Sequence, residues 1–328
     1  AADSILEKYH LKTFQQRVDV LNQCPDPEVG SQVKRFLDAK PEGKPFFLWA
    51  NFSDPHHPWN PDPEDRPDPS RLKLPAHWPD YPELRMQLAD YFGEINRLDR
   101  RIGEVVQILR DRQVLEETLL VFLGDNGAAL PHGKGSLYDP GSNVPCILRW
   151  PGVIQPGRES LDLLSGEDLA PTLLQAAGVP PIAKMSGRSF LDLLRGKNFA
   201  AREFIFVERG PHGSAPVSVD MVNSGYDLSR CVRSHRYKFI YNCTPWIPYA
   251  PVDSAGGPGW RRTQAAAADG TLDRRLVDTY FTTPRPVYEF YDLENDPSEL
   301  INLSGRPEVS EIEAKHRVAL TEKMILDC

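Results

Sequence analysis

A short apolar run, Phe46-Phe47-Leu48-Trp49-Ala50-Asn51-Phe52, lies between turn-forming residues, which is typical of a buried strand. A second run, Thr118-Leu119-Leu120-Val121-Phe122-Leu123, also predicts a buried strand and leads into Gly124-Asp125-Asn126-Gly127. Between them, over residues 83–112, apolar residues recur at steps of three and four, which predicts an amphipathic helix. A strand, a crossover helix and a second strand form a βαβ unit, so we expect an α/β fold with a parallel sheet.

Elements outside this unit follow from local signals. Nine prolines in residues 55–82 exclude a continuous helix or central strand there and predict a long surface loop. Residues 144–150 predict a third strand, and residues 168–177 a helix that Gly178 and Pro180 end.

The pattern changes near residue 202. Residues 203–207 and 236–241 are typical of strands without a crossover helix between them, so we expect a smaller antiparallel domain with a closing helix at 307–325. The Ala- and Gly-rich segment 255–270 predicts a mobile loop. We therefore expect a catalytic α/β domain in residues 1–200 and a C-terminal α+β domain in residues 201–328.

Composition limits the classes of protein. The chain has 328 residues, 40% of them hydrophobic, which is enough for a substantial core. Its net charge of −8 gives no general reason to bind nucleic acid, and no apolar run approaches the ~20 residues of a membrane span. Five scattered cysteines predict neither a disulfide framework nor a structural zinc site.

Three loops that follow strands or lie just downstream carry unusual side chains, and ligands of open α/β sheets bind beyond the strands' carboxyl ends. Asp125 and Asn126 offer the oxygen ligands that suit calcium or magnesium, or else form a simple turn. Lys134, between two glycines, can approach an anion closely or be merely solvated. In the His56-His57 pair, a single imidazole acting as hydrogen-bond donor or general acid is favoured over a zinc pair, with a structural loop histidine as the alternative.

Together, the order and spacing of these motifs resemble those of the formylglycine-dependent sulfatase family, in the alkaline-phosphatase-like superfamily. The matching segments are Ser53-Asp54-Pro55-His56-His57-Pro58, Asp125-Asn126-Gly127, Gly133-Lys134-Gly135-Ser136-Leu137-Tyr138-Asp139-Pro140-Gly141, Arg149-Trp150-Pro151-Gly152, Asp168-Leu169-Ala170-Pro171-Thr172 and Tyr288-Glu289-Phe290-Tyr291-Asp292-Leu293-Glu294-Asn295-Asp296-Pro297.

The resemblance implies a mixed, mostly parallel sheet between helices and a smaller C-terminal domain with an antiparallel sheet. It also implies that Asp125 and Asn126 are calcium ligands, that His56 contacts the sulfate, and that Lys134 bridges sulfate and nucleophile. Lys8-Tyr9-His10 resembles the family's Gly-Lys-x-His motif, with Glu7 in place of glycine, which makes Lys8 and His10 further catalytic candidates. The implied substrate is a sulfated carbohydrate, and the implied location is periplasmic, extracellular or lysosomal.

One departure from the family is decisive for activity. Formylglycine arises from Cys or Ser in a Cys/Ser-x-Pro-Ser-Arg motif, through a formylglycine-generating enzyme. The sequence lacks that motif, since Cys243-Thr244-Pro245 is followed by Trp246 and Pro67-Asp68-Pro69-Ser70-Arg71 carries proline at the nucleophile position. The family's N-terminal Asp-Asp pair is absent too, so the calcium site is incomplete. We expect an incomplete sulfatase chain, inactive alone.

Two other functions stay open. A non-catalytic pseudo-sulfatase would bind sulfated glycans through His56 and Lys134. A phosphoester or phosphonate hydrolase of the same superfamily would act on a different ester, although such relatives usually need additional Asp and His zinc ligands.

Overall fold

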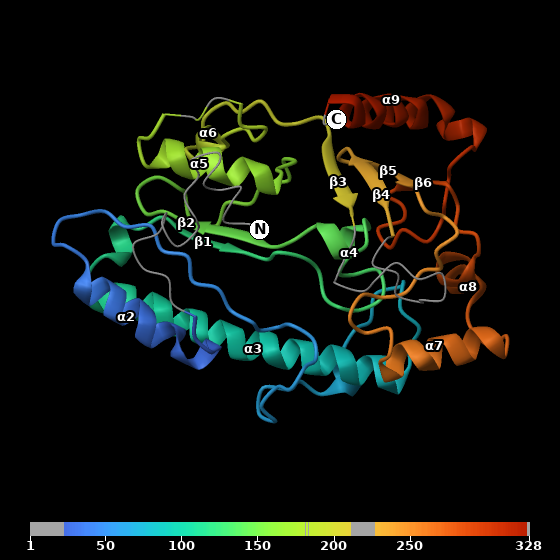
Figure 1. Ribbon diagram of the computed structural model, residues 1–328, viewed down its shortest axis with the longest axis horizontal. Coiled ribbons are helices and arrows are strands. Elements are labelled where there is room, and N and C mark those ends of the chain that lie inside the picture. The colour runs from blue at the N-terminus through green and yellow to red at the C-terminus, as the bar shows by residue number, and fades with distance from the viewer. Residues whose placement is uncertain (1–22, 181, 183, 211–226, 327–328) are drawn as a thin grey trace, which may run out of the picture.

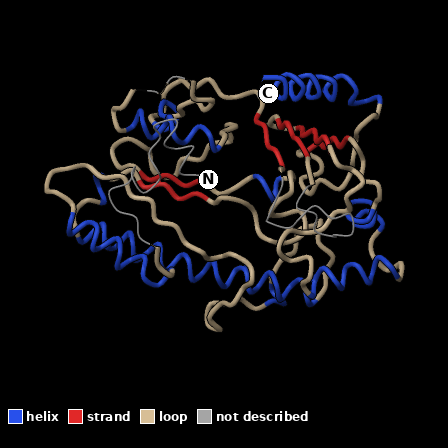
Figure 2. Tube along the Cα trace, viewed as in Figure 1, coloured by secondary structure: helices blue, strands red, loops and turns tan. Residues whose placement is uncertain are grey.

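The fold is known from a computed structural model that describes residues 23–180, 182, 184–210 and 227–326. In Figure 1 the short β1–β2 pair lies between the helices α2 and α3 on one side and α5 and α6 on the other, and a second sheet lies under α9. Figure 2 shows how much of the chain between these elements is loop. Within the described residues, no helix combines the length and apolar character needed to cross a membrane.

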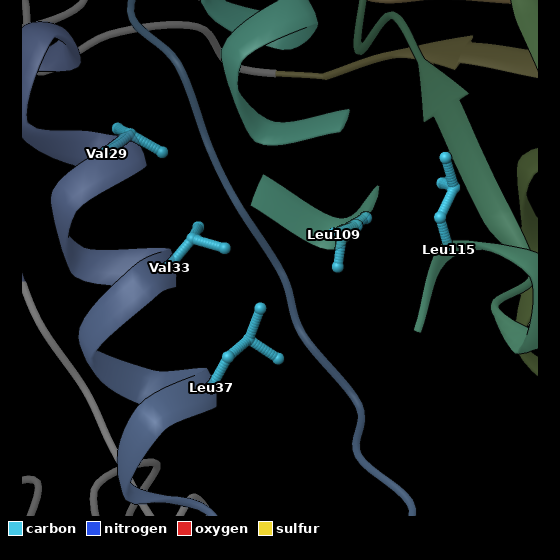
Figure 3. Close-up of a cluster of buried hydrophobic side chains, with 5 residues drawn as sticks. All are labelled: Val29, Val33, Leu37, Leu109 and Leu115. Atoms are coloured by element: carbon cyan, nitrogen blue, oxygen red, sulfur yellow. The ribbon is translucent and has the colours of Figure 1, made fainter. Parts of the chain in front are cut away.

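The helix predicted at residues 83–112 is confirmed as α3, Pro82–Asp111. Pro82 at the first turn lacks the N–H that a helix start leaves unpaired, and Glu83 complements the positive end of the helix dipole. A second helix, α2 (Val29–Ala39), lies along its C-terminal half. Figure 3 shows Val29, Val33 and Leu37 of α2 facing Leu109 and Leu115, and this cluster forms one core of the molecule.

Strands were predicted at 118–123 and 144–150, and both exist as β1 (Leu120–Leu123) and β2 (Cys146–Arg149). They pair antiparallel, with Leu120 opposite Arg149.

The predicted buried strand at residues 46–52 was wrong. The described residues give it no strand partner, and Phe47 and Trp49 are 72% and 79% exposed. Alternate residues Phe46, Leu48, Ala50 and Phe52 pack on the α2–α3 core, so the segment is extended with one face covered. The parallel pairing that the βαβ interpretation predicted is consequently not among the described strand pairs.

The proline-rich loop is confirmed: between residues 53 and 81 the only regular element is the 3₁₀ turn Pro69–Arg71. The loop is nevertheless packed against α3. A Cβ at Gly93 would lie 2.5 Å from Cβ of Pro61, so the close approach requires glycine.

After β2, the predicted helix at 168–177 is confirmed as α5 (Leu169–Ala176), preceded by the 3₁₀ turn Gly166–Asp168. Ser165 and Asp168 form a reciprocal capping box at the start of this 3₁₀ turn. Short helices α4 (Asp139–Ser142) and α6 (Leu191–Leu194) complete this part.

The expected antiparallel sheet and closing helix are also confirmed. The sheet has the order β3 (Ile205–Arg209), β4 (Ser229–Arg233), β5 (Tyr237–Asn242) and β6 (Tyr288–Asp292), all neighbours antiparallel. The turn Pro307–Val309 leads into α9 (Ser310–Leu326), whose Leu320 packs with Val232, Phe239 and Phe290.

The mobile loop predicted at 255–270 was wrong, because this segment contains α7 (Pro258–Ala268). Its alanines are strong helix formers, and Trp260 and Ala266 are 2% and 0% exposed. Helix α8 (Arg274–Phe281) packs beside it through Leu276 and Tyr280. The N–H of Gly259 donates to Oε1 of Gln87 on α3 (3.1 Å), which joins the two halves of the fold.

Candidate functional site

A buried group of charges holds the start of the proline-rich loop on α3. The carboxylate of Asp26 accepts hydrogen bonds from the backbone N–H groups of Ser53 (2.8 Å) and Asp54 (2.9 Å). Asp54 in turn accepts two hydrogen bonds from Arg97 (2.8 and 2.9 Å) and one from Arg101 (2.7 Å). Because these groups are charged and largely buried, the backbone two residues before His56 is held in place.

His56 lies next in the loop with a largely exposed ring. Its Nδ1 is 2.6 Å from the carbonyl oxygen of His57. A carbonyl oxygen only accepts, so Nδ1 carries the proton and Nε2 of the neutral ring is an acceptor. The ammonium of Lys134 lies 3.0 Å from Nε2 and donates to it. The two residues that were singled out from separate loops are therefore in direct contact.

Lys134 is positioned by its neighbouring glycines. Its backbone N–H donates to the carbonyl oxygen of Ala128 (2.7 Å). A Cβ at Gly133 would lie 2.0 Å from that same oxygen, and a Cβ at Gly135, where φ is 76°, would lie 2.5 Å from Cγ2 of Val252. The loop can fold this tightly only with glycine on both sides of the lysine.

Asp253 is the third member of this group, and the sequence analysis missed it. Its Oδ2 lies 2.7 Å from Nζ of Lys134 and 3.9 Å from Nε2 of His56. The residue belongs to the loop between β5 and α7 and has φ of 64°, a conformation that Asp tolerates better than most residues. No motif marks it in the sequence, since tertiary contacts bring this loop to Lys134: Val252 packs on Gly135, and the hydroxyl oxygen of Tyr249 accepts a hydrogen bond from the N–H of His132 (2.7 Å).

His57 differs from His56 in its surroundings. Its ring packs edge-on against Trp59, with centroids 5.0 Å apart. Burial lowers the pKa of His57, Asp253 opposes this shift, and the charges of His56 and Lys134 add to it. Of the two adjacent histidines, His56 is the one that joins Lys134 and Asp253.

Asp125 and Asn126 follow β1 directly. The N–H of Asn126 donates to Oδ1 of Asp125 (2.8 Å), and the side-chain Nδ2 of Asn126 donates to the carbonyl oxygen of Gly127 (2.8 Å). An Asx turn would use the N–H of Gly127, which instead donates to the carbonyl oxygen of Gly141 (3.0 Å), and Gly127 is not among the glycines with positive φ. Asp125 also faces Tyr91, whose pKa is raised by burial and by this carboxylate. The described contacts do not connect either residue to Lys134.

The donor chemistry of this pair suits calcium, but their number does not complete a site. Calcium takes six to eight oxygen ligands, and Asp125 and Asn126 provide two side chains. Within the described ranges, no group of three or more His, Cys, Asp and Glu side chains could hold a metal ion. We therefore derive no catalytic step through a metal.

The remaining candidates add little geometry. Lys8 and His10 lie outside the described residues. The four described cysteines, Cys24, Cys146, Cys231 and Cys243, are free thiols. Burial raises the pKa of Cys231 to about 12 and also raises the pKa of Cys146 and Cys243, so these three are poor thiolate nucleophiles.

A buried ionic cluster connects the loop that carries Lys134 to the C-terminal sheet. Asp139, at the start of α4, lies 2.6 Å from the ammonium of Lys238 and 3.0 Å from Arg233. Lys238 is fully buried and is also 2.7 Å from Glu299. Burial raises the pKa of Glu299 to about 7, and Lys238 opposes this shift. The loop that carries Lys134 is thereby tied to β4 and β5.

Comparison with known proteins identifies the family. Residues 3–179 match the family model described as Sulfatase, which is more than half of the chain, and the chain belongs to this family. Residues 131–245 match the model described as N-sulphoglucosamine sulphohydrolase, C-terminal.

Two curated relatives are an ulvan-active sulfatase of Formosa agariphila and human N-sulphoglucosamine sulphohydrolase. The first is 31% identical over 73% of this chain and 38% of its own length. The second is 27% identical over 85% of this chain and 60% of its own length. The chain thus spans less than two thirds of these relatives.

Solved structures show the same alkaline-phosphatase-like fold. One, described as a complex with its substrate D-glucosamine-2-N,6-O-disulfate, has a TM-score of 0.63 at 17% identity. The match covers 93% of this chain and 70% of that chain. A phosphonate monoester hydrolase from Silicibacter pomeroyi has a TM-score of 0.65 at 19% identity, with 93% and 60% covered. At these identities the likeness concerns the fold alone.

Proposed function

We propose that this chain provides the sulfate-binding part of a site that hydrolyses sulfate esters, with a sulfated carbohydrate as substrate. The contact between Lys134 and His56 (3.0 Å) carries the proposal, because it places a cation and a proton-carrying ring at one point reached by two loops. Family membership supports the reaction class. The names of the relatives, ulvan-active sulfatase and N-sulphoglucosamine sulphohydrolase, support a sulfated carbohydrate.

The chemistry assigns a role to each group. A sulfate ester is an anion whose leaving oxygen gains negative charge as the S–O bond breaks. The Lys134 ammonium, largely shielded from solvent, neutralises the sulfate oxygens, where fixed charges act most strongly. When the sulfate takes over the hydrogen bond of the Lys134 ammonium, Nε2 of the exposed His56 ring is free to take up a proton from solvent, to contact the sulfate and to donate that proton to the leaving oxygen. Lys8 and His10 are proposed as further residues of this site.

Two components of the family's chemistry are not complete in these 328 residues. Asp125 and Asn126 are proposed as two ligands of a calcium ion, which would neutralise sulfate charge when bound. The formylglycine nucleophile has no precursor motif here, so a formylglycine-generating enzyme has no matching target. The 328-residue chain alone is expected to show no turnover.

Sulfate binding tests the proposal directly. Titration of inorganic sulfate into the 328-residue chain, followed by calorimetry, should show saturable binding. Lys134→Ala should weaken it at least tenfold, because a charge-assisted contact to the anion is lost. Lys197→Ala, at an exposed lysine after α6, is the matched control and should bind as the parent chain does. Equal binding by the Lys134 and Lys197 variants would refute the anion site.

Turnover and coding sequence separate the catalytic from the binding interpretation. Measurable hydrolysis of an aryl sulfate by the purified chain would contradict the expected inactivity. In-frame DNA upstream of Ala1 that encodes an Asp-Asp pair and a Cys/Ser-x-Pro-Ser-Arg motif would support an active parent enzyme. A start codon next to Ala1 would favour the pseudo-sulfatase that binds sulfated glycans without turnover.

A phosphonate or phosphomonoester hydrolase is the second candidate, favoured by the structural likeness to a phosphonate monoester hydrolase. The same titration with methylphosphonate and inorganic phosphate decides between them. Tighter binding of sulfate supports the sulfatase function, and tighter binding of phosphonate supports the alternative.

A further inference from the structure

A carboxylate is an unexpected neighbour for the anion-binding lysine. Asp253 lies 2.7 Å from Nζ of Lys134 and 3.9 Å from Nε2 of His56, and its side chain is 29% exposed against 13% for Lys134. From this arrangement we infer that Asp253 determines specificity: it accepts hydrogen bonds from substrate hydroxyl groups beside the sulfate ester. This inference rests on the proposed function, because it presumes that the sulfate group binds at Lys134.

Electrostatics gives Asp253 a selective effect. A sulfate oxygen that binds Lys134 must approach a carboxylate of the same sign and take over the cation that this carboxylate holds. A ligand with no hydrogen-bond donor weakens the ion pair of Asp253 with Lys134 and offers this carboxylate no hydrogen bond in exchange, which is unfavourable. A ligand with hydroxyl groups next to its sulfate replaces the lost partner with a charge-assisted hydrogen bond.

Backbone contacts keep the loop that carries Asp253 from moving away from Lys134. Val252 packs against Gly135, and a Cβ at Gly135 would lie 2.5 Å from Cγ2 of Val252. The N–H of Ser254 donates to the carbonyl oxygen of Val252 (2.8 Å), and the N–H of Gly257 donates to that of Ser254 (2.8 Å). The carboxylate therefore stays beside Lys134 when a ligand arrives, and the ligand must satisfy it.

The site should therefore distinguish ligands by whether they carry hydrogen-bond donors beside the sulfate group. A sulfated monosaccharide such as glucosamine 6-sulfate carries hydroxyl groups that can reach a carboxylate beside its sulfate. Phenyl sulfate and inorganic sulfate present no such donors. The site should prefer the sugar sulfate over the other two, and this preference should depend on Asp253.

Binding of the three ligands to the 328-residue chain and to Asp253→Asn tests the inference. Asn is tolerated at positive φ and keeps the side-chain shape, so the loop should be preserved. In the variant, phenyl sulfate and inorganic sulfate should bind several-fold tighter, because the competing negative charge is gone. The preference for glucosamine 6-sulfate over phenyl sulfate should fall about tenfold, the ratio for one charge-assisted hydrogen bond.

Asp99→Asn on α3 removes an equal charge from an exposed position and should leave the preference unchanged. An unchanged preference in Asp253→Asn, with Lys134→Ala still losing sulfate binding, overturns the inference and leaves the proposed function standing. Binding that does not depend on Lys134 refutes the proposed function itself. Near-ultraviolet circular dichroism of each variant confirms that a change in binding does not reflect unfolding.

Discussion

His77 is a titratable residue that the proposed site does not use. It is 4% exposed, and its ring stacks on that of His132 with centroids 5.1 Å apart. Neither ring nitrogen of His77 has a hydrogen-bond partner among the described residues. Burial therefore lowers the pKa of His77 from 6.5 to about 4. The folded protein holds this ring neutral.

This burial predicts an acid-sensitive contribution to stability. Between pH 6.5 and 4 the unfolded chain protonates His77 while the folded chain does not, so the free energy of unfolding falls as the pH falls. The full loss is about 3 kcal/mol. His77→Phe removes the titrating group and keeps an aromatic ring. Urea unfolding of both proteins at pH 7.5 and pH 5 should show the variant gaining stability relative to the parent at the lower pH; an equal difference at both would contradict the prediction.

At the scale of single residues, sequence patterns identified two loop side chains of the site and missed the residue that tertiary packing supplies. His56 and Lys134 were singled out from their loops, and the structure places them in contact. Asp253 has no such signal, because its role depends on Val252 meeting Gly135 across the fold. The catalytic and metal-binding roles of the sequence candidates stay predictions.

Helix α3 shows what one element does for the site. Its Arg97 holds Asp54, whose side chain is 9% exposed, at the base of the His56 loop. The hydrogen bonds that Arg97 donates to the Asp54 carboxylate raise the pKa of Arg97, which means that the folded state stabilises the charged pair. The helix therefore fixes the start of the loop as well as filling the core.

Arg97→Met should destabilise the protein by about 3 kcal/mol, because it leaves the Asp54 carboxylate buried with one of its two arginine partners gone. Arg110→Met on the exposed surface of α3 is the matched control and should change stability by less than about 0.5 kcal/mol. Urea unfolding of the two variants measures both. Similar midpoints for the two variants would show that the buried pair does not stabilise the loop.

At the scale of elements, the long periodic pattern of α3 and several short strands were predicted accurately, and two segments were not. The stripe of α3 spans 30 residues and fixes both its type and its ends closely. Residues 46–52 have strand-like composition, but a strand also needs a paired backbone, which the sequence does not reveal. The glycines of segment 255–270 predict a loop, whereas its alanines lie in α7, in which Trp260 is buried.

Across the whole molecule, the ionic cluster of Asp139, Lys238 and Glu299 connects the Lys134 loop to the C-terminal sheet. Asp139 lies in the sulfatase-like segment that follows Lys134, Lys238 lies on β5, and Glu299 follows β6. Sequence patterns predicted most of the strands and the helices around them. An ionic cluster that joins three distant segments leaves no periodic pattern in the sequence, so it could not be predicted in this way. The domain boundary expected near residue 200 stays a prediction.

Two of the buried titrating groups, His77 and Glu299, have opposite effects on stability over nearly the same pH range. Glu299 has its pKa raised by burial from 4.5 to about 7, so the folded chain binds more protons there, and stability falls as the pH rises from 4.5 to 7. His77, with its lowered pKa, makes stability fall as the pH drops from 6.5 to 4. Each effect amounts to about 3 kcal/mol, so the contributions of these two groups to the free energy of unfolding nearly offset each other.

Removing one of these groups should therefore reveal the pH dependence of stability that the other causes. Glu299→Gln keeps an acceptor for the N–H of Asp139 and should gain stability relative to the parent as the pH rises from 5 to 8. His77→Phe should gain stability relative to the parent as the pH falls, and the double variant should follow the pH dependence of the parent closely. Urea unfolding of the four proteins across pH 4.5–8 measures these slopes. Parallel curves for the two single variants would contradict the opposition, because they would show that neither group changes its proton binding on folding.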